Sequence, residues 1–96
     1  NTMPQLNVNL SKDLRTAFNT RVAVLKMTKT GAVKEAIKAS IKAKTPPAAA
    51  NPEDGRRWAV AVDGETAYEL KVHAAATGGT MGEALRAAIF NWTYEL

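Results

Sequence analysis

The sequence has no cysteine and one histidine, which excludes a disulfide framework and any zinc site built from cysteine. Aromatic residues make up only 6% of the chain, so aliphatic residues and alanine must form most of the core. No apolar run approaches the length needed to cross a bilayer, and we expect no membrane partner. Nothing resembles a nucleophile motif, a phosphate-binding glycine loop or a metal motif, so we expect neither enzyme activity nor a cofactor or metal.

The net charge of +4 is unevenly distributed along the chain. Residues 1–45 carry nine Lys or Arg against two acidic residues, a net charge of +7, whereas residues 46–96 carry four against seven, a net charge of −3. A basic segment favours an anionic partner, most commonly nucleic acid, although charge alone fits a merely solvated surface equally well. The absence of cysteine also fits a reducing compartment, and we expect a cytoplasmic, nucleoid-associated location.

A proline-containing stretch without branched aliphatic residues divides the chain. Residues 44–57 read KTPPAAANPEDGRR, which is the composition of a linker. The sequence therefore predicts a first unit at residues 1–43 and a second unit at residues 58–96.

The first unit contains one strand pattern and two helix patterns. Residues 5–10 alternate polar and apolar side chains, which predicts a half-buried strand. Ser11 is a suitable N-cap for an amphipathic helix that extends to about Met27. After a break at residues 28–31, a second amphipathic helix is predicted from about Thr30 to Ala43.

The second unit repeats this order of elements. Residues 58–62 read as a strand, Asp63 and Gly64 begin a helix, Gly78 and Gly79 end it, and Thr80 caps a last helix. Shifting the first unit by 52 residues superimposes it on the second without a gap. This register of strand, break and helix indicates an internal repeat.

One strand and two short helices cannot bury their apolar faces alone, whereas two such units can. We therefore predict an α+β fold that is mostly α, with a two-stranded antiparallel β-ribbon and four helices on one side of it. The two units would form a single-chain pseudo-dimer about an approximate two-fold axis. A domain-swapped pair of chains is the alternative, and self-association on DNA stays open.

Strand, helix, turn and helix in this register resemble the ribbon-helix-helix family of Arc- and MetJ-like repressors. Residues 3–10 (MPQLNVNL) are similar to the strand of the Arc repressor, residues 30–37 (TGAVKEAI) to the family's second helix, and residues 74–80 (AAATGGT) to its inter-helix turn. The tandem form is similar to TraY-like accessory proteins of conjugative plasmids. The resemblance covers nearly all of the chain except the linker, and it implies a β-ribbon that enters the major groove of double-stranded DNA.

The resemblance also implies which residues meet the DNA. Alternate strand residues would face the bases, where Asn and Gln suit adenine and Arg suits guanine. The candidate base contacts are Gln5, Asn7, Asn9 and Arg57, while the remaining matched positions are Ala59 and Ala61. The start of the second helix of each unit would hold a phosphate. The candidate phosphate contacts are Thr28, Lys29, Thr30, Gly31, Thr80 and Gly82, with Arg56 added because it precedes the second strand.

Other interpretations of these candidate contact residues stay open. The three amides of residues 5–9 also fit the solvated face of a hairpin, and the lysines fit ordinary solvated helix positions. Phe18, Trp58, Phe90 and Trp92 are expected in core or rim packing rather than in base stacking. The leading function is DNA binding by a transcriptional repressor or a plasmid or phage DNA-organising protein. The alternatives are an antitoxin-like protein-interaction module and a non-specific DNA-coating protein.

Overall fold

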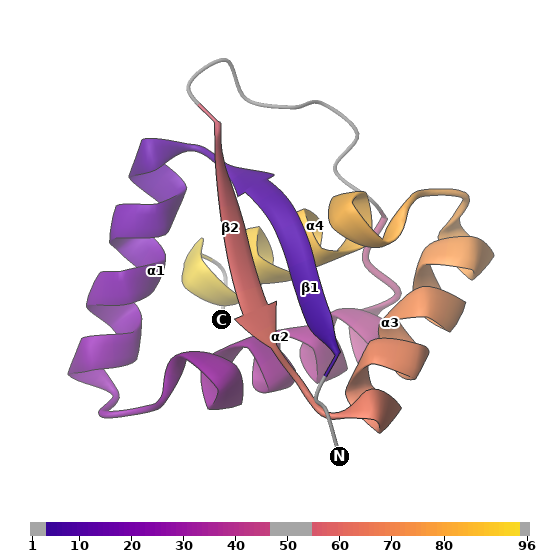
Figure 1. Ribbon diagram of the computed structural model, residues 1–96, viewed down its shortest axis with the longest axis horizontal. Coiled ribbons are helices and arrows are strands. Elements are labelled where there is room, and N and C mark those ends of the chain that lie inside the picture. Colours follow the sequence, from indigo (N-terminus) through magenta and orange to yellow (C-terminus); the bar gives the residue numbers. More distant parts are fainter. Residues whose placement is uncertain (1–3, 47–54, 95–96) are drawn as a thin grey trace.

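The fold consists of two strands and four helices, in the order in which the sequence predicts them. The computed structural model describes residues 4–46 and 55–94. Its elements are β1 (Gln5–Leu10), α1 (Lys12–Val24), α2 (Lys29–Ala43), β2 (Arg56–Ala61), α3 (Gly64–Thr77) and α4 (Met81–Tyr94), shown in Figure 1. This is a mostly helical α+β fold, and it confirms the predicted two-stranded antiparallel sheet and four helices.

The two strands pair antiparallel although they lie far apart in the sequence. Gln5 pairs with Ala61, Asn7 with Ala59, and Asn9 with Arg57. In β1 the polar residues are exposed, and the intervening residues Leu6, Val8 and Leu10 are buried. Because successive side chains of a strand point to opposite faces, one face of the ribbon belongs to the core and the other is open.

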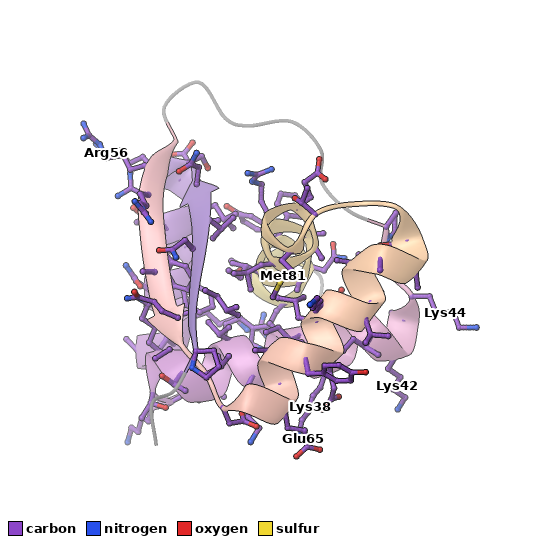
Figure 2. The ribbon with its side chains drawn as sticks, turned by 45° about the vertical axis from the view of Figure 1, so that its right-hand side comes forward. Lys38, Lys42, Lys44, Arg56, Glu65 and Met81 are labelled. Carbon is purple, nitrogen blue, oxygen red and sulfur yellow. The ribbon has the colours of Figure 1, made fainter. Side chains whose placement is uncertain are left out.

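All four helices contribute buried side chains to the core on one face of this ribbon, and Figure 2 shows α3 and α4 on that side. Both strands contribute to a single hydrophobic core together with side chains from every helix. The fully buried larger side chains include Leu10, Phe18, Ile37, Leu70, Leu85 and Ile89. The helices of the two predicted units pack across one another, since α1 contacts α4 and α2 contacts α3. Neither unit could therefore bury this core without the other.

Aromatic side chains fill the space between α1, α4 and the ribbon. The Phe18 ring lies edge-on to Trp58 at 5.6 Å between centroids and 5.4 Å from the Trp92 ring. The Arg21 guanidinium covers Trp92 at 4.9 Å. Phe90 is 46% exposed and contacts Tyr94 on the outer face of α4, so this ring packs at the rim and not in the core.

The helices start at the residues whose side chains cap them. The Ser11 hydroxyl accepts the Leu14 N–H at 3.2 Å, and the Asp63 carboxylate accepts the Thr66 N–H at 3.2 Å. The Thr66 hydroxyl also donates to Asp63 at 2.6 Å, which holds the pKa of that carboxyl below its ordinary value. Since an N-cap satisfies a backbone donor that the helix leaves unpaired, these residues fix where α1 and α3 begin.

Helices α1, α2 and α3 end in the same type of cap. In α1 this cap makes the helix shorter than the sequence predicts. The N–H of Met27 donates to Val22 O while Lys26 takes a left-handed φ of 55°, so α1 ends at Val24 instead of reaching Met27. Lys44 (φ 54°) and Gly78 (φ 82°) end α2 and α3 with the same pattern of hydrogen bonds. A lysine tolerates this conformation at a cost of about 1–2 kcal/mol, which the capping hydrogen bonds offset.

The connection between the units differs slightly from its prediction. Strand β2 begins at Arg56, two residues before the expected start at Trp58. Residues 47–54, most of the predicted linker, lie outside the described residues. Just before them, Thr45 O lies 3.1 Å from Nε2 of His73, a buried residue of α3. Within residues 4–46 and 55–94, no helix is long and apolar enough to span a membrane.

The core position of Phe18 gives a direct test of this packing. Phe18→Ala should lower the free energy of unfolding by about 3–5 kcal/mol, because it removes a ring that contacts both tryptophans. Phe90→Ala is the matched control, and it should change stability by less than about 1 kcal/mol because that ring is half exposed. Urea unfolding followed by circular dichroism measures both values, and equal losses would contradict the described core.

Candidate nucleic-acid interface

The open face of the ribbon brings together six side chains that alternate along the two strands. β1 contributes Gln5, Asn7 and Asn9, all exposed. The pairing register places Ala61, Ala59 and Arg57 opposite them in that order. All four candidate base contacts therefore lie on one surface, opposite the helices. Arg56 pairs with Leu10 instead, at the end of the ribbon, and its exposed side chain extends away from the helices (Figure 2).

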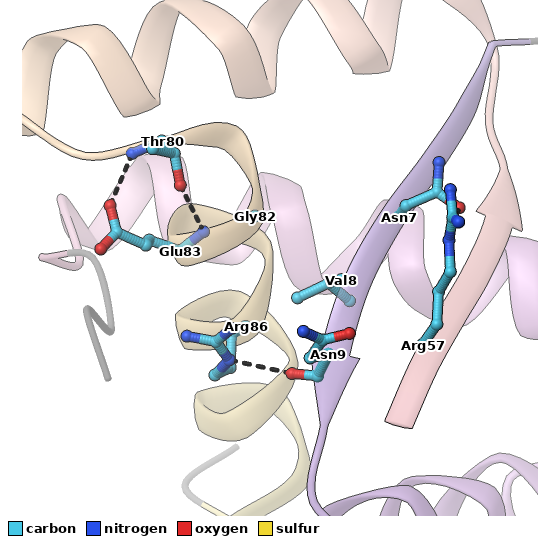
Figure 3. A pocket seen from close by; sticks show the side chains of 8 residues that line it. All are labelled: Asn7, Val8, Asn9, Arg57, Thr80, Gly82, Glu83 and Arg86. Carbon is cyan, nitrogen blue, oxygen red and sulfur yellow. Dashed lines mark hydrogen bonds between the residues drawn. The ribbon is translucent and has the colours of Figure 1, made fainter. Parts of the chain in front are cut away.

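Polar side chains concentrate at one end of this face. The Arg57 side chain reaches diagonally across the ribbon, and its Nε donates to Oδ1 of Asn7 at 3.4 Å (Figure 3). Asn9 is the direct cross-strand neighbour of Arg57. The opposite end holds Gln5 beside Ala61. The two ends thus offer different hydrogen-bonding groups to a ligand on this face.

The start of α2 is attached to the outer edge of β2. Lys29 Nζ donates to Ala59 O at 2.6 Å, and the Thr30 hydroxyl donates to Ala61 O at 3.1 Å. The Thr28 hydroxyl caps the helix by accepting the Gly31 N–H at 3.0 Å. The four candidate phosphate contacts of the first unit therefore lie together at this edge. Their polar side chains already bind the ribbon or the helix, a role that sequence reasoning did not assign to them.

Lys29 has a second contact that affects its charge. Its Nζ lies 4.3 Å from the centroid of the Trp58 ring, a distance at which the cation is attracted to the aromatic face. Partial burial lowers the pKa of Lys29 below the ordinary value of 10.5, because burial disfavours the charged form. The hydrogen bond to Ala59 and the contact with the Trp58 ring together hold the Lys29 amine at the edge of the ribbon.

The start of α4 lies at the outer edge of β1 and is capped differently. The Thr80 hydroxyl accepts the Glu83 N–H at 3.1 Å, and the Glu83 carboxylate accepts the Thr80 N–H at 2.8 Å. This reciprocal pair is a capping box. At Gly82 the helix comes close to the strand, since an added Cβ would lie 3.9 Å from Asn7 O. Thr80 and Gly82 thus occupy the edge position that Thr28 and Thr30 occupy on the other side.

Arg86 is the residue of this edge that sequence reasoning missed. It is 9% exposed, and its Nε donates to Asn9 O at 3.0 Å. The signal in the sequence was an arginine within the apolar run Ala84–Ile89, since a buried guanidinium requires a partner. The corresponding residue of the first unit, Lys34, forms an ion pair with Asp63 at 3.6 Å instead.

A depression of about 570 Å³ lies between the β1 edge and α4 (Figure 3). Its lining combines the polar end of the ribbon with the first turns of the helix, namely Asn7, Val8, Asn9, Arg57, Thr80, Gly82, Glu83 and Arg86. Apart from the Glu83 carboxylate, which accepts the Thr80 N–H, the polar side chains of this lining carry amide, hydroxyl and guanidinium groups. Such groups bind the phosphates and base edges of nucleic acids. Among the described residues, no three His, Asp or Glu side chains are grouped so that they could hold a metal ion.

Comparisons of this chain with protein-family models, with curated proteins and with solved structures gave no match. The function must therefore be argued from the geometry of the ribbon and its two edges.

The lowered pKa of Lys29 gives a test of this edge. NMR titration of its side-chain Cε–Hε groups should give a midpoint below 10.5, with the ammonium bound to Ala59 O at lower pH. A midpoint at or above 10.5 in the parent protein would show that the amine is not buried against the ribbon.

Proposed function

We propose that this protein binds double-stranded DNA and reads its sequence by inserting the open face of the β-ribbon into the major groove. The observation that carries this proposal is the exposed row of amide and guanidinium groups on the one ribbon face that no helix covers. The major groove of B-DNA admits a two-stranded ribbon and presents a distinct pattern of donors and acceptors for each base pair.

The edges of the ribbon support the same function. A ribbon in the major groove has a phosphate backbone on each side, and here a helix N-terminus lies at each edge. Backbone N–H groups and the helix dipole favour an anion at such a position. Lys29 adds a cation at the β2 edge, and Arg86 adds a guanidinium at the β1 edge. The basic character of residues 1–45 fits a polyanionic partner.

The two units form a pseudo-dimer in this proposal. The pairing register supports this arrangement, because Asn7 pairs with Ala59, its own equivalent after the 52-residue shift. An approximate two-fold axis would pass between these two residues. Corresponding residues also cap the helices: Ser11 and Asp63 cap α1 and α3, and Thr28 and Thr80 cap α2 and α4. Such symmetry matches the ribbon-helix-helix family that the sequence resembles, and the role would be transcriptional repression or the organisation of plasmid or phage DNA.

The decisive test compares substitutions at two adjacent positions of β1. One should affect DNA recognition and the other should affect folding. Asn7→Ala should weaken binding to a duplex selected from a random pool by about 1–3 kcal/mol, because a two-point amide contact is lost. Stability should stay nearly unchanged, since the side chain is exposed. Leu6→Ala should instead cost about 2–5 kcal/mol of folding free energy, because that side chain is buried.

Fluorescence anisotropy at fixed salt and thermal melting measure these two effects. If Asn7→Ala binds the selected duplex as well as the parent does, the ribbon is not the reading element. The protein-interaction alternative then gains support. Equal affinity of the parent for all duplexes would instead favour non-specific DNA coating.

The pseudo-dimer arrangement predicts the assembly state in the absence of DNA. A chain that supplies both strands and all four helices should fold without a second copy. Sedimentation at micromolar concentration should therefore show a folded monomer. An obligate dimer would instead indicate that strands or helices are exchanged between chains.

A further inference from the structure

The open face of the ribbon, called the reading face below, differs between its two ends. The register of the strands is nevertheless symmetric about Asn7 and Ala59. The 52-residue shift maps the exposed β1 side chains onto the β2 face in the order Gln5 to Arg57, Asn7 to Ala59, and Asn9 to Ala61. One end of the ribbon consequently presents Asn9 and Arg57, while the other presents Gln5 and Ala61. A two-fold operation therefore exchanges an arginine for a glutamine and an asparagine for an alanine.

From this asymmetry, and resting on the proposed function, we propose that the protein recognises a non-palindromic DNA site and that Arg57 reads a guanine in its more stringent half. A symmetric reading face selects an inverted repeat, because both half-sites meet the same side chains. Here the two half-sites meet different chemistry. Asn9 and Arg57 suit adenine and guanine, whereas the alanine beside Gln5 offers only a contact with a thymine methyl group.

The contact between Arg57 and Asn7 explains why this arginine is suited to reading a base. Its Nε is bonded to the Asn7 amide, so the guanidinium is held over the ribbon face beside β1. That contact uses Nε, and the two terminal Nη groups are the donors that would meet O6 and N7 of guanine. Asn7 is in this arrangement a positioning residue for Arg57 as well as a candidate base contact.

The neighbouring arginine provides an internal comparison. Arg56 carries the same charge one residue earlier, but it pairs with Leu10 at the end of the ribbon and not with one of the exposed polar residues of β1. If Arg57 acted only through its charge, the two residues would have similar effects on DNA binding. If it reads a base, only Arg57 determines sequence preference.

The first experiment selects duplexes from a random-sequence pool with the full chain and then measures affinity for every single-base change in the selected site. The parent should select a site without inverted-repeat symmetry that contains a preferred guanine in one half. Arg57→Ala should reduce the preference for that guanine by roughly 5- to 150-fold while leaving the other half-site unaffected. Arg56→Ala should weaken binding to all sequences alike.

A gain-of-function variant tests the asymmetry from the other direction. Gln5→Arg combined with Ala61→Asn gives both ends of the ribbon the same arginine and asparagine pair. This variant should bind an inverted repeat of the stringent half-site more tightly than it binds the site selected by the parent. The parent should bind the inverted repeat no more tightly than its own selected site. Circular dichroism and melting of the variant confirm that it is folded before its preference is measured.

The outcomes distinguish this inference from the proposed function. A parent protein that selects an inverted repeat would overturn the asymmetric reading while leaving DNA recognition by the ribbon intact. Retention of the guanine preference in Arg57→Ala would overturn the role of that residue. A parent protein that binds no duplex, or all duplexes equally, would overturn the proposed sequence-specific function and this inference together.

Discussion

The arrangement of the molecule depends on one constraint. A two-stranded ribbon that presents side chains to a partner on one face can pack against the core only with its other face. Leu6, Val8 and Leu10 point from β1 into the core, and so the residues between them must face outward. Side chains from all four helices pack against that apolar side. The side chains of the outward face are available for recognition because the fold does not depend on them.

The helices also determine what lies beside that face. The strands have outer edges whose carbonyl groups need donors, and side chains near the starts of α2 and α4 supply them. At the β2 edge the donors are Lys29 and Thr30, and at the β1 edge the donor is Arg86. The same contacts that protect the ribbon from pairing with another chain place cations and helix N-termini along it. The starts of α2 and α4 therefore have two roles. They donate hydrogen bonds to the carbonyl groups at the strand edges, and they supply the proposed phosphate contacts.

The repeated pattern allowed much of the fold to be predicted. Alternation in residues 5–10 fixes the faces of β1, and residues such as Ser11, Asp63 and Thr80 begin helices because their side chains accept backbone N–H groups. The end of α1 could not be predicted in the same way, whereas α2 ends at Ala43 as the sequence predicts. Lys26 and Lys44 take left-handed conformations that glycine normally supplies, and only the capping hydrogen bonds explain their tolerance.

The candidate site was predictable only where strand periodicity applied. Gln5, Asn7, Asn9 and Arg57 share a face because of strand alternation and the register that the repeat implies. The attachment of Lys29 to Ala59 O, and of Arg86 to Asn9 O, depends on how the helices cross the ribbon. Nothing local in the sequence encodes those distances. They arise from tertiary packing between the two units.

The most direct measurement is an NMR titration of the full chain with duplex DNA, followed through its backbone and side-chain amide signals. If the open ribbon face enters the major groove, the largest shift changes should fall on Asn7, Asn9 and Ala59 and on the first turns of α2 and α4. Changes confined to the outer face of α4 around Phe90 and Tyr94, with the ribbon signals unmoved, would contradict recognition of DNA by the ribbon.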